Sequence, residues 1–224
     1  MSEKSIIDSF KKTWHWIWNS DSLLSWIVAL IIIFIFVKYI FFPILSLVMG
    51  TSLPLAGVES SSMDHQIVND DFGNLNLCGA QYSDEEKEYV DFNEYWELCG
   101  NWYEEHNISK ETFLTFDLKN GFKKGDILIV WGRFSPGIGD IIIFKPNEDS
   151  RAPRPIVHRI IKIDNSIIQT KGDHNREQLS RENNVYKTDE TEISEEQIIG
   201  KVIFKIPYLG WFKIWVMELI DLVF

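Results

Sequence analysis

The chain has 224 residues, of which 45% are hydrophobic, and a formal net charge of −11 at pH 7. This length suits one domain with room for a small second one, and the negative charge argues against a nucleic-acid-binding protein, which needs a basic face for phosphates. The only two cysteines, Cys78 and Cys99, form no CxxC pair, and no phosphate loop or dinucleotide fingerprint occurs. No metal site and no cofactor is therefore expected.

Residues 1–21 are predicted to be a cytoplasmic segment next to a membrane. They contain three lysines and three tryptophans, namely Lys4, Lys11, Lys12, Trp14, Trp16 and Trp18. Tryptophans beside a hydrophobic run suit the membrane–water interface. The alternative is a short amphipathic helix in a soluble core.

A membrane anchor is predicted within residues 22–49. The stretch Leu23–Phe42 is nearly all apolar and reaches the about 20 residues that a spanning helix needs if Lys38 extends its charge to the interface. Pro43 marks an end or a kink. The alternative, a cleaved signal peptide, would have an apolar core of about 7–15 residues. The lysines before the span predict a single-pass protein of the cell membrane, with the N-terminus in the cytoplasm and the remainder outside.

Residues 50–69 are expected to connect the anchor to a serine run, and residues 70–115 to form an inserted lobe. The insertion is rich in acidic and aromatic residues and is predicted to be partly helical around positions 85–102. Its acids are interpreted as solvated surface. Outside the cytoplasm, Cys78 and Cys99 are expected to form a disulfide; two buried free thiols are the alternative.

Residues 116–206 are predicted to form a β domain. Five stretches rich in Ile and Val are predicted strands, at positions 126–131, 140–144, 157–163, 166–171 and 198–206. Asp164-Asn165 favours a hairpin turn. No helix-length periodic segment intervenes, so a mainly β, antiparallel and partly barrel-like fold is predicted. Residues 207–224 are expected to form an amphipathic or membrane-interface helix, with the start of a second span as the alternative.

Four short stretches, in this order, resemble the conserved boxes of type I signal peptidases. They are Ser60-x-Ser62-Met63, Gly139-Asp140-Ile141-Ile142-Ile143-Phe144, Val157-His158-Arg159 and Thr170-Lys171-Gly172-Asp173. The histidine, where bacterial enzymes carry lysine, is similar to the archaeal and endoplasmic-reticulum branch, and Gly200-Lys201-Val202 with Ile206-Pro207-Tyr208-Leu209-Gly210 looks archaeal. The resemblance covers Leu23 to about Ser62 and Phe122 to Gly210, and it does not cover the insertion.

The resemblance implies that Ser62 is the nucleophile, His158 the general base and Asp173 the acid that orients the histidine. A serine alcohol is a poor nucleophile until a hydrogen-bonded imidazole removes its proton. The Ser60 hydroxyl and the Ser62 backbone N–H would bind the oxyanion. The family often has a second acid a few residues on, which is absent at positions 178–180. Glu177 and Glu182 are the nearest substitutes, and Glu177 is the alternative acid.

Other bases remain open alternatives at this point. The rival histidines are His65, His106 and His174, and the rival lysines are Lys145 and Lys171, which burial could turn into bases. Neither lysine falls where bacterial relatives place theirs.

The resulting prediction is a membrane-bound serine endopeptidase that removes signal peptides from secreted preproteins after small residues. Its expected partners are these preproteins, the lipid bilayer and the protein-export channel. One alternative is a membrane-anchored β domain that binds partners through its lobe and has a degenerate peptidase site. Another is a peptidase dedicated to a single substrate.

Overall fold

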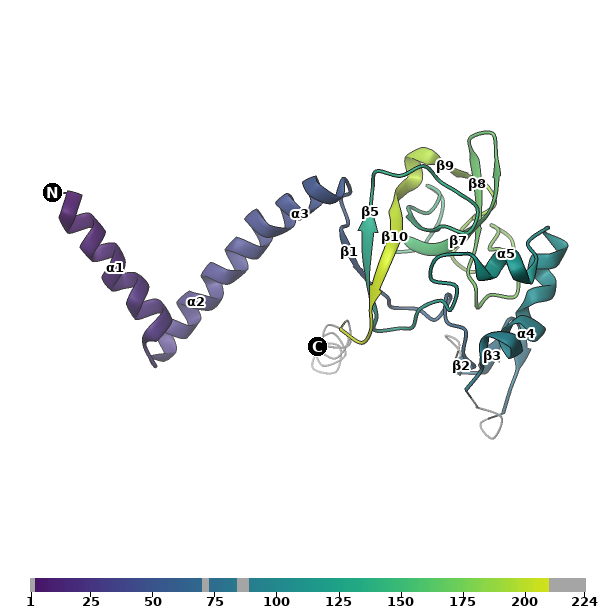
Figure 1. The fold of residues 1–224 in the computed structure, drawn as a ribbon, viewed down its shortest axis with the longest axis horizontal. Helices are drawn as coiled ribbons and strands as arrows, with labels where there is room; N and C mark the ends of the chain where they lie inside the picture. Colours follow the sequence, from purple (N-terminus) through teal and green to yellow (C-terminus); the bar gives the residue numbers. More distant parts are fainter. Residues whose placement is uncertain (1–2, 70–72, 84–88, 210–224) are drawn as a thin grey trace. The chain divides into compact units, whose positions relative to one another are not determined.

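The computed structural model describes residues 3–69, 73–83 and 89–209. It forms two compact units, which divide between Val48 and Met49. The smaller unit is helical, and the larger unit is built on β-sheet (Figure 1).

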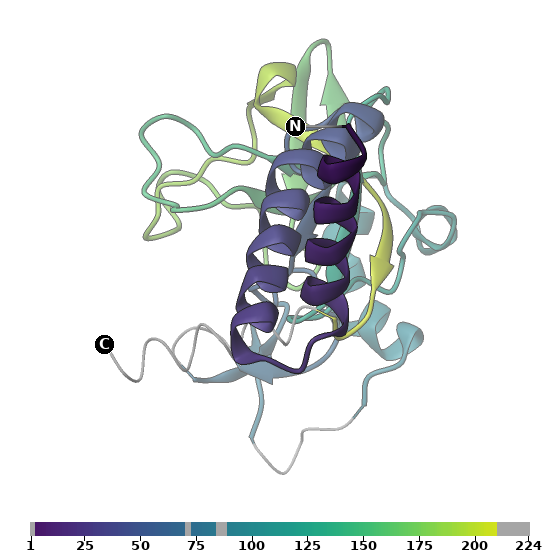
Figure 2. The same cartoon turned by 90° about the vertical axis from the view of Figure 1, so that its left-hand side faces the viewer.

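The smaller unit begins with two helices, α1 (Glu3–Asn19) and α2 (Leu23–Phe36). Ser22 caps α2, because its side chain accepts a hydrogen bond from the Ser25 N–H. Ser25 is buried, and its hydroxyl donates to the Ile17 carbonyl oxygen at 2.9 Å, so it ties the two helices together. The two helices meet at this connection and diverge from it in Figure 1; Figure 2 shows the same pair after a 90° turn.

The apolar helix continues past the predicted break. After α2 come a π-helical turn (Val37–Phe41) and α3 (Phe42–Met49). Pro43 has no N–H and cannot make a regular helical bond, and a π turn is one way in which the helix accommodates this. The whole segment Leu23–Met49 has 27 residues, and its most apolar stretch of 18 residues has a mean hydropathy of 2.8 and no buried residue. By length and composition it suits a membrane span.

The larger unit contains a seven-stranded antiparallel sheet, which confirms the predicted mainly β fold. The strands follow the order β1 (Leu55–Gly57), β5 (Ile127–Trp131), β10 (Ile198–Ile206), β6 (Ile141–Phe144), β7 (Ile156–Asp164), β8 (Ile167–Lys171) and β9 (Ile193–Ser194). The five long predicted strands are all present. The β7–β8 hairpin turns at Asn165, whose φ of 54° is one that asparagine tolerates. A short 3₁₀ helix (Glu195–Gln197) joins β9 to β10.

The sheet curls, so strand β6 is buried on both of its faces. Ile141 and Ile143 pack into one core with Leu128, while Ile142 and Phe144 pack into another. Bulges in β7 and β10 shift the pairing register, and bulges increase local twist and bending. Burial on both faces explains why β6 is a continuous apolar run rather than an alternating one.

The insertion folds as a lobe on this sheet. Its strands β3 (Leu75–Leu77) and β4 (Ala80–Gln81) form a small sheet with β2 (Val68–Asn69), which directly precedes the insertion, and α4 (Phe92–Glu105) and α5 (Lys110–Leu114) follow. Asp91 begins α4 through a capping box with Glu94. A disulfide joins Cys78, at the β3–β4 turn, to Cys99 on α4, as predicted.

The lobe shares its hydrophobic core with the large sheet. Its buried aromatic residues pack in one cluster with Ile161 of β7. The lobe is therefore seated on the strand that carries His158. The helix predicted for residues 207–224 falls outside the described residues from position 210 onward.

Candidate active site

Ser62 lies in a tight turn that a buried methionine anchors. The Asp64 N–H donates to the Ser61 carbonyl oxygen at 2.8 Å and closes the turn. Met63 is 1% exposed and packs into the sheet core, and its carbonyl oxygen accepts from the Phe122 N–H at 3.1 Å. Ser62 itself is half-buried, with its Oγ 3.3 Å from the Oγ of Ser60. The turn thus holds the Ser62 hydroxyl at the surface, while Met63 beside it is fixed in the core.

His158 is on β7 and is 2% exposed. Its Nδ1 is hydrogen-bonded to Oε2 of Glu190. This bond fixes the orientation of the ring and leaves Nε2 as the nitrogen available for chemistry.

Gly172 separates His158 from the nucleophile turn. A Cβ built on Gly172 would lie 2.7 Å from His158 Nε2 and 2.8 Å from the Ser62 carbonyl oxygen. Nε2 and the backbone of Ser62 therefore approach the same point. The Ser62 and His158 side chains are not hydrogen-bonded to each other in the described part of the chain, where Ser62 Oγ contacts Ser60. Catalytic hydrogen bonds are often long without substrate and tighten when it binds.

Glu190 is the acid that contacts His158, and sequence reasoning missed it. Its Oε1 accepts from the Leu179 N–H at 2.6 Å, and its Oε2 accepts from the Thr170 hydroxyl at 3.0 Å. Backbone bonds at 2.9 Å to Thr170 and 3.0 Å to Leu179 hold the residue between β8 and the following loop. It is one of six acidic residues between positions 182 and 196, and nothing in its spacing distinguished it.

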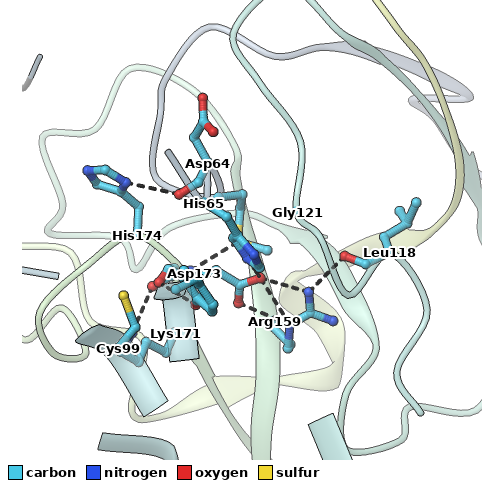
Figure 3. Close-up of polar contacts among 12 residues, drawn as sticks. Asp64, His65, Cys99, Leu118, Gly121, Arg159, Lys171, Asp173 and His174 are labelled. Atoms are coloured by element: carbon cyan, nitrogen blue, oxygen red, sulfur yellow. Dashed lines mark hydrogen bonds and ion pairs between the residues drawn. The ribbon is translucent and has the colours of Figure 1, made fainter. Parts of the chain in front are cut away.

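Asp173, the predicted orienting acid, forms a different buried cluster (Figure 3). Its carboxylate accepts from Arg159 Nη2 at 2.7 Å and from the Tyr103 hydroxyl at 2.9 Å, and it lies 3.0 Å from His65 Nε2. Burial alone would raise the pKa of Asp173, but the charge of Arg159 and the hydrogen bonds of His65 and Arg159 hold it well below its usual range. Asp173 is thus the partner of Arg159 and does not contact His158.

Glu177, the alternative acid, is also away from His158. Its side chain is exposed, and its Oε1 accepts a hydrogen bond from Asn183 Nδ2 at 3.4 Å. The structure therefore supports neither of the two acids that the sequence suggested for His158.

The rival lysines are placed elsewhere. Lys145 is exposed. Lys171 is fully buried, and burial lowers its pKa to about 8 although the charges of Asp173 and Glu190 act in the opposite direction. Its Nζ donates to the Gly172 carbonyl oxygen at 3.0 Å and lies over the rings of Trp102 and Tyr103. Lys171 thus faces the lobe, whereas its neighbour Thr170 faces Glu190.

The rival histidines have other partners. His65 is paired with Asp173, and its ring stacks on Tyr95 with centroids 3.7 Å apart. Nδ1 of His174 lies 2.9 Å from the Asp64 carbonyl oxygen, and burial lowers the pKa of His174. His106 is exposed at the end of α4. Among these four histidines, which all lie in the larger unit, His158 is the one whose Nε2 faces the Ser62 turn across Gly172.

Comparisons with known proteins agree with the family resemblance of the four sequence stretches. No family model matches the chain. The signal peptidase complex catalytic subunits of Fusarium vanettenii and of Saccharomyces cerevisiae strain YJM789 are 27% and 29% identical over 112 residues. The matched region is 47% of this chain and 62% and 64% of those proteins, so the chain spans less than two thirds of their length. By sequence, the chain is thus similar to the endoplasmic-reticulum branch of type I signal peptidases, the branch that its histidine-containing stretch resembles.

Proposed function

We propose that the chain is a membrane-anchored serine endopeptidase that removes signal peptides from secreted preproteins. The observation that carries the proposal is the arrangement around Gly172, where His158 Nε2 and the Ser62 backbone approach one point. The similarity to signal peptidase complex catalytic subunits supplies the substrate class.

In the proposed mechanism, His158 Nε2 takes the proton of Ser62 as Oγ attacks the scissile carbonyl carbon. Glu190 holds the proton of His158 on Nδ1 and stabilises the imidazolium that forms. His158 then gives the proton to the amine of the leaving mature protein. A water molecule, activated by the same nitrogen, hydrolyses the acyl-enzyme and releases the signal peptide.

Ser60 and the Ser62 N–H are the proposed oxyanion donors. The Ser60 hydroxyl lies 3.3 Å from Ser62 Oγ, beside the position where the substrate carbonyl must be attacked. A donor in such a position stabilises the transition state by about 3 kcal/mol.

The proposed location is the cell membrane, with residues 1–21 in the cytoplasm and the β unit outside. Two observations support it: the lysines that precede the apolar helix, and the Cys78–Cys99 disulfide, since disulfides persist in oxidising compartments. The bilayer and the protein-export channel, from which preproteins emerge, are the proposed surroundings.

Cleavage of a model preprotein in detergent tests the proposal. The intact chain should release the mature protein, Ser62→Ala should not, and Ser61→Ala, the matched control in the same serine run, should remain active. Equal cleavage by the intact chain and by Ser62→Ala would contradict the assignment of the nucleophile.

A further inference from the structure

The inserted lobe holds the segment Gly172–His174 through three separate contacts. The Tyr103 hydroxyl donates to Asp173 Oδ1 at 2.9 Å, and the Tyr95 hydroxyl donates to the Asp173 carbonyl oxygen at 2.9 Å. The Cys78 N–H donates to the His174 carbonyl oxygen at 3.0 Å. Both tyrosines are fully buried, so the two hydrogen bonds that they donate are shielded from water.

On their other side, the same three residues contact His158 or the turn that carries Ser62 and Met63. Gly172 lies against His158 Nε2 and the Ser62 carbonyl oxygen. The Asp173 N–H lies 3.4 Å from the sulfur of Met63, and the His174 N–H donates to the Ser62 carbonyl oxygen at 2.9 Å. A displacement of this segment would therefore move both the base and the nucleophile turn.

The disulfide unites the two parts of the lobe that hold the segment. Cys78 lies at the β3–β4 turn, which contacts His174, and Cys99 lies on α4, which carries Tyr95 and Tyr103. The contacts to the segment consequently come from one closed unit and not from two independent loops.

We propose that the lobe is part of the active-site scaffold and that Tyr95 and Tyr103 are positioning residues for Ser62 and His158. The inference rests on the proposed peptidase function and adds to it a role for the insertion. Neither tyrosine touches the reacting groups. Each acts through Asp173, whose carboxylate Arg159 and His65 hold from other directions.

The test is the substitution Tyr103→Phe in the full chain, which removes one hydroxyl and keeps the ring in the aromatic core. We expect kcat to fall about tenfold with little change in KM, because a hydrogen bond to a charged group is lost while substrate contacts remain. Hydrogen exchange at the His174 N–H should become faster. The matched control is Tyr89→Phe, since Tyr89 is in the same lobe and 78% exposed; it should behave as the intact chain does.

A second measurement uses the disulfide. Reduction should lower kcat of the intact chain, and the double variant Cys78→Ser, Cys99→Ser should have the low kcat and no response to reductant. If this double variant does not fold, the kcat and the hydrogen exchange of Tyr103→Phe still test the inference.

The outcomes separate this inference from the proposed function. A normal kcat in Tyr103→Phe would overturn the inference, and so would a reduced kcat with unchanged exchange, because the effect would not pass through the segment. If the intact chain cleaves no preprotein, the proposed function fails. In that case, faster hydrogen exchange in Tyr103→Phe would still support the hold of the lobe on Gly172–His174. Unchanged exchange would overturn it.

Discussion

At the residue scale, the proposed mechanism depends on Glu190, whose carboxylate is hydrogen-bonded to His158 Nδ1 and would keep the proton on that nitrogen. In Glu190→Gln, the amide N–H₂ can face Nδ1 and favour the wrong tautomer. We expect kcat to fall by at least about a hundredfold while the fold is retained. The matched control is Glu177→Gln, because Glu177 is exposed and does not contact His158.

Circular dichroism would confirm that both variants are folded before preprotein cleavage is measured. A folded Glu190→Gln with normal turnover, beside an inactive and folded Glu177→Gln, would transfer the orienting role to Glu177.

Gly172 gives a second prediction at this scale. Its φ is not positive, so alanine is excluded by space and not by backbone conformation. The new methyl group would press on His158 Nε2 and on the Ser62 carbonyl oxygen, and overpacking of this kind costs about 1–3 kcal/mol of stability. Displacing catalytic groups should lower kcat by more than about tenfold.

The control for this substitution is Gly57→Ala. A Cβ at Gly57 would have no atom within 4 Å, and its φ is not positive either. Kinetics and thermal melting of the two variants should therefore differ. Equal activity would mean that Gly172 does not define the space between base and nucleophile.

The identity of the orienting acid is where sequence reasoning was weakest. Ser62 and His158 lie in short stretches that resemble boxes of a known family. Glu190 reaches His158 only because β8 and the loop to β9 fold back on each other. Asp173 held the matching position, but Arg159 from the neighbouring strand binds its carboxylate. Such a pairing depends on strand register, which a single sequence does not display.

At the element scale, β8 has two chemically different faces. Thr170 contacts Glu190 on one face, and Lys171 points into the aromatic lobe on the other. The strand therefore separates the proposed catalytic groups from a buried lysine with a pKa of about 8.

The buried lysine predicts a pH dependence of stability. The pKa of Lys171 is lower in the folded chain, about 8, than its ordinary value of 10.5. Between these values the unfolded chain binds more protons, so the free energy of unfolding should rise with pH. From pH 8 to pH 10 the rise should be on the order of 2 kcal/mol relative to Lys171→Met.

Urea unfolding in detergent, followed by tryptophan fluorescence, would measure this difference. Lys145→Met is the control, because Lys145 is exposed, and it should keep the slope of the intact chain. The range stops at pH 10 because burial raises the pKa values of Tyr95 and Tyr103, which act in the opposite direction above that pH. Parallel slopes for the intact chain and Lys171→Met would refute the prediction.

The elements that sequence predicted best are those with strong local patterns. The Ile- and Val-rich runs became β5, β6, β7, β8 and β10, with bounds close to those expected. The short strands β1 and β9 and the small lobe sheet were not predicted, because two or three residues carry no periodicity and pair only through contacts made elsewhere in the fold. Helix α4 begins at Phe92 because Asp91 caps it.

At the scale of the whole molecule, the proposed function requires the β unit to lie outside the cytoplasm. Both cysteines of the chain form the disulfide, so one introduced cysteine would be the single free thiol. Glu148→Cys, on an exposed turn of the β unit, should react with an impermeant maleimide in intact cells. Thr13→Cys, on the exposed surface of α1, should react only after permeabilisation. The reverse pattern would invert the proposed orientation.

The central claim is that Ser62 and His158 act in one proton-transfer step. Its most direct test is the cleavage rate of a model preprotein by Ser62→Ala, by His158→Ala and by the double variant. Groups that act as a unit have strongly non-additive effects. We therefore predict that each single substitution abolishes detectable cleavage and that the double variant loses little more. Near-normal turnover by a folded His158→Ala would contradict the account and would point to another base.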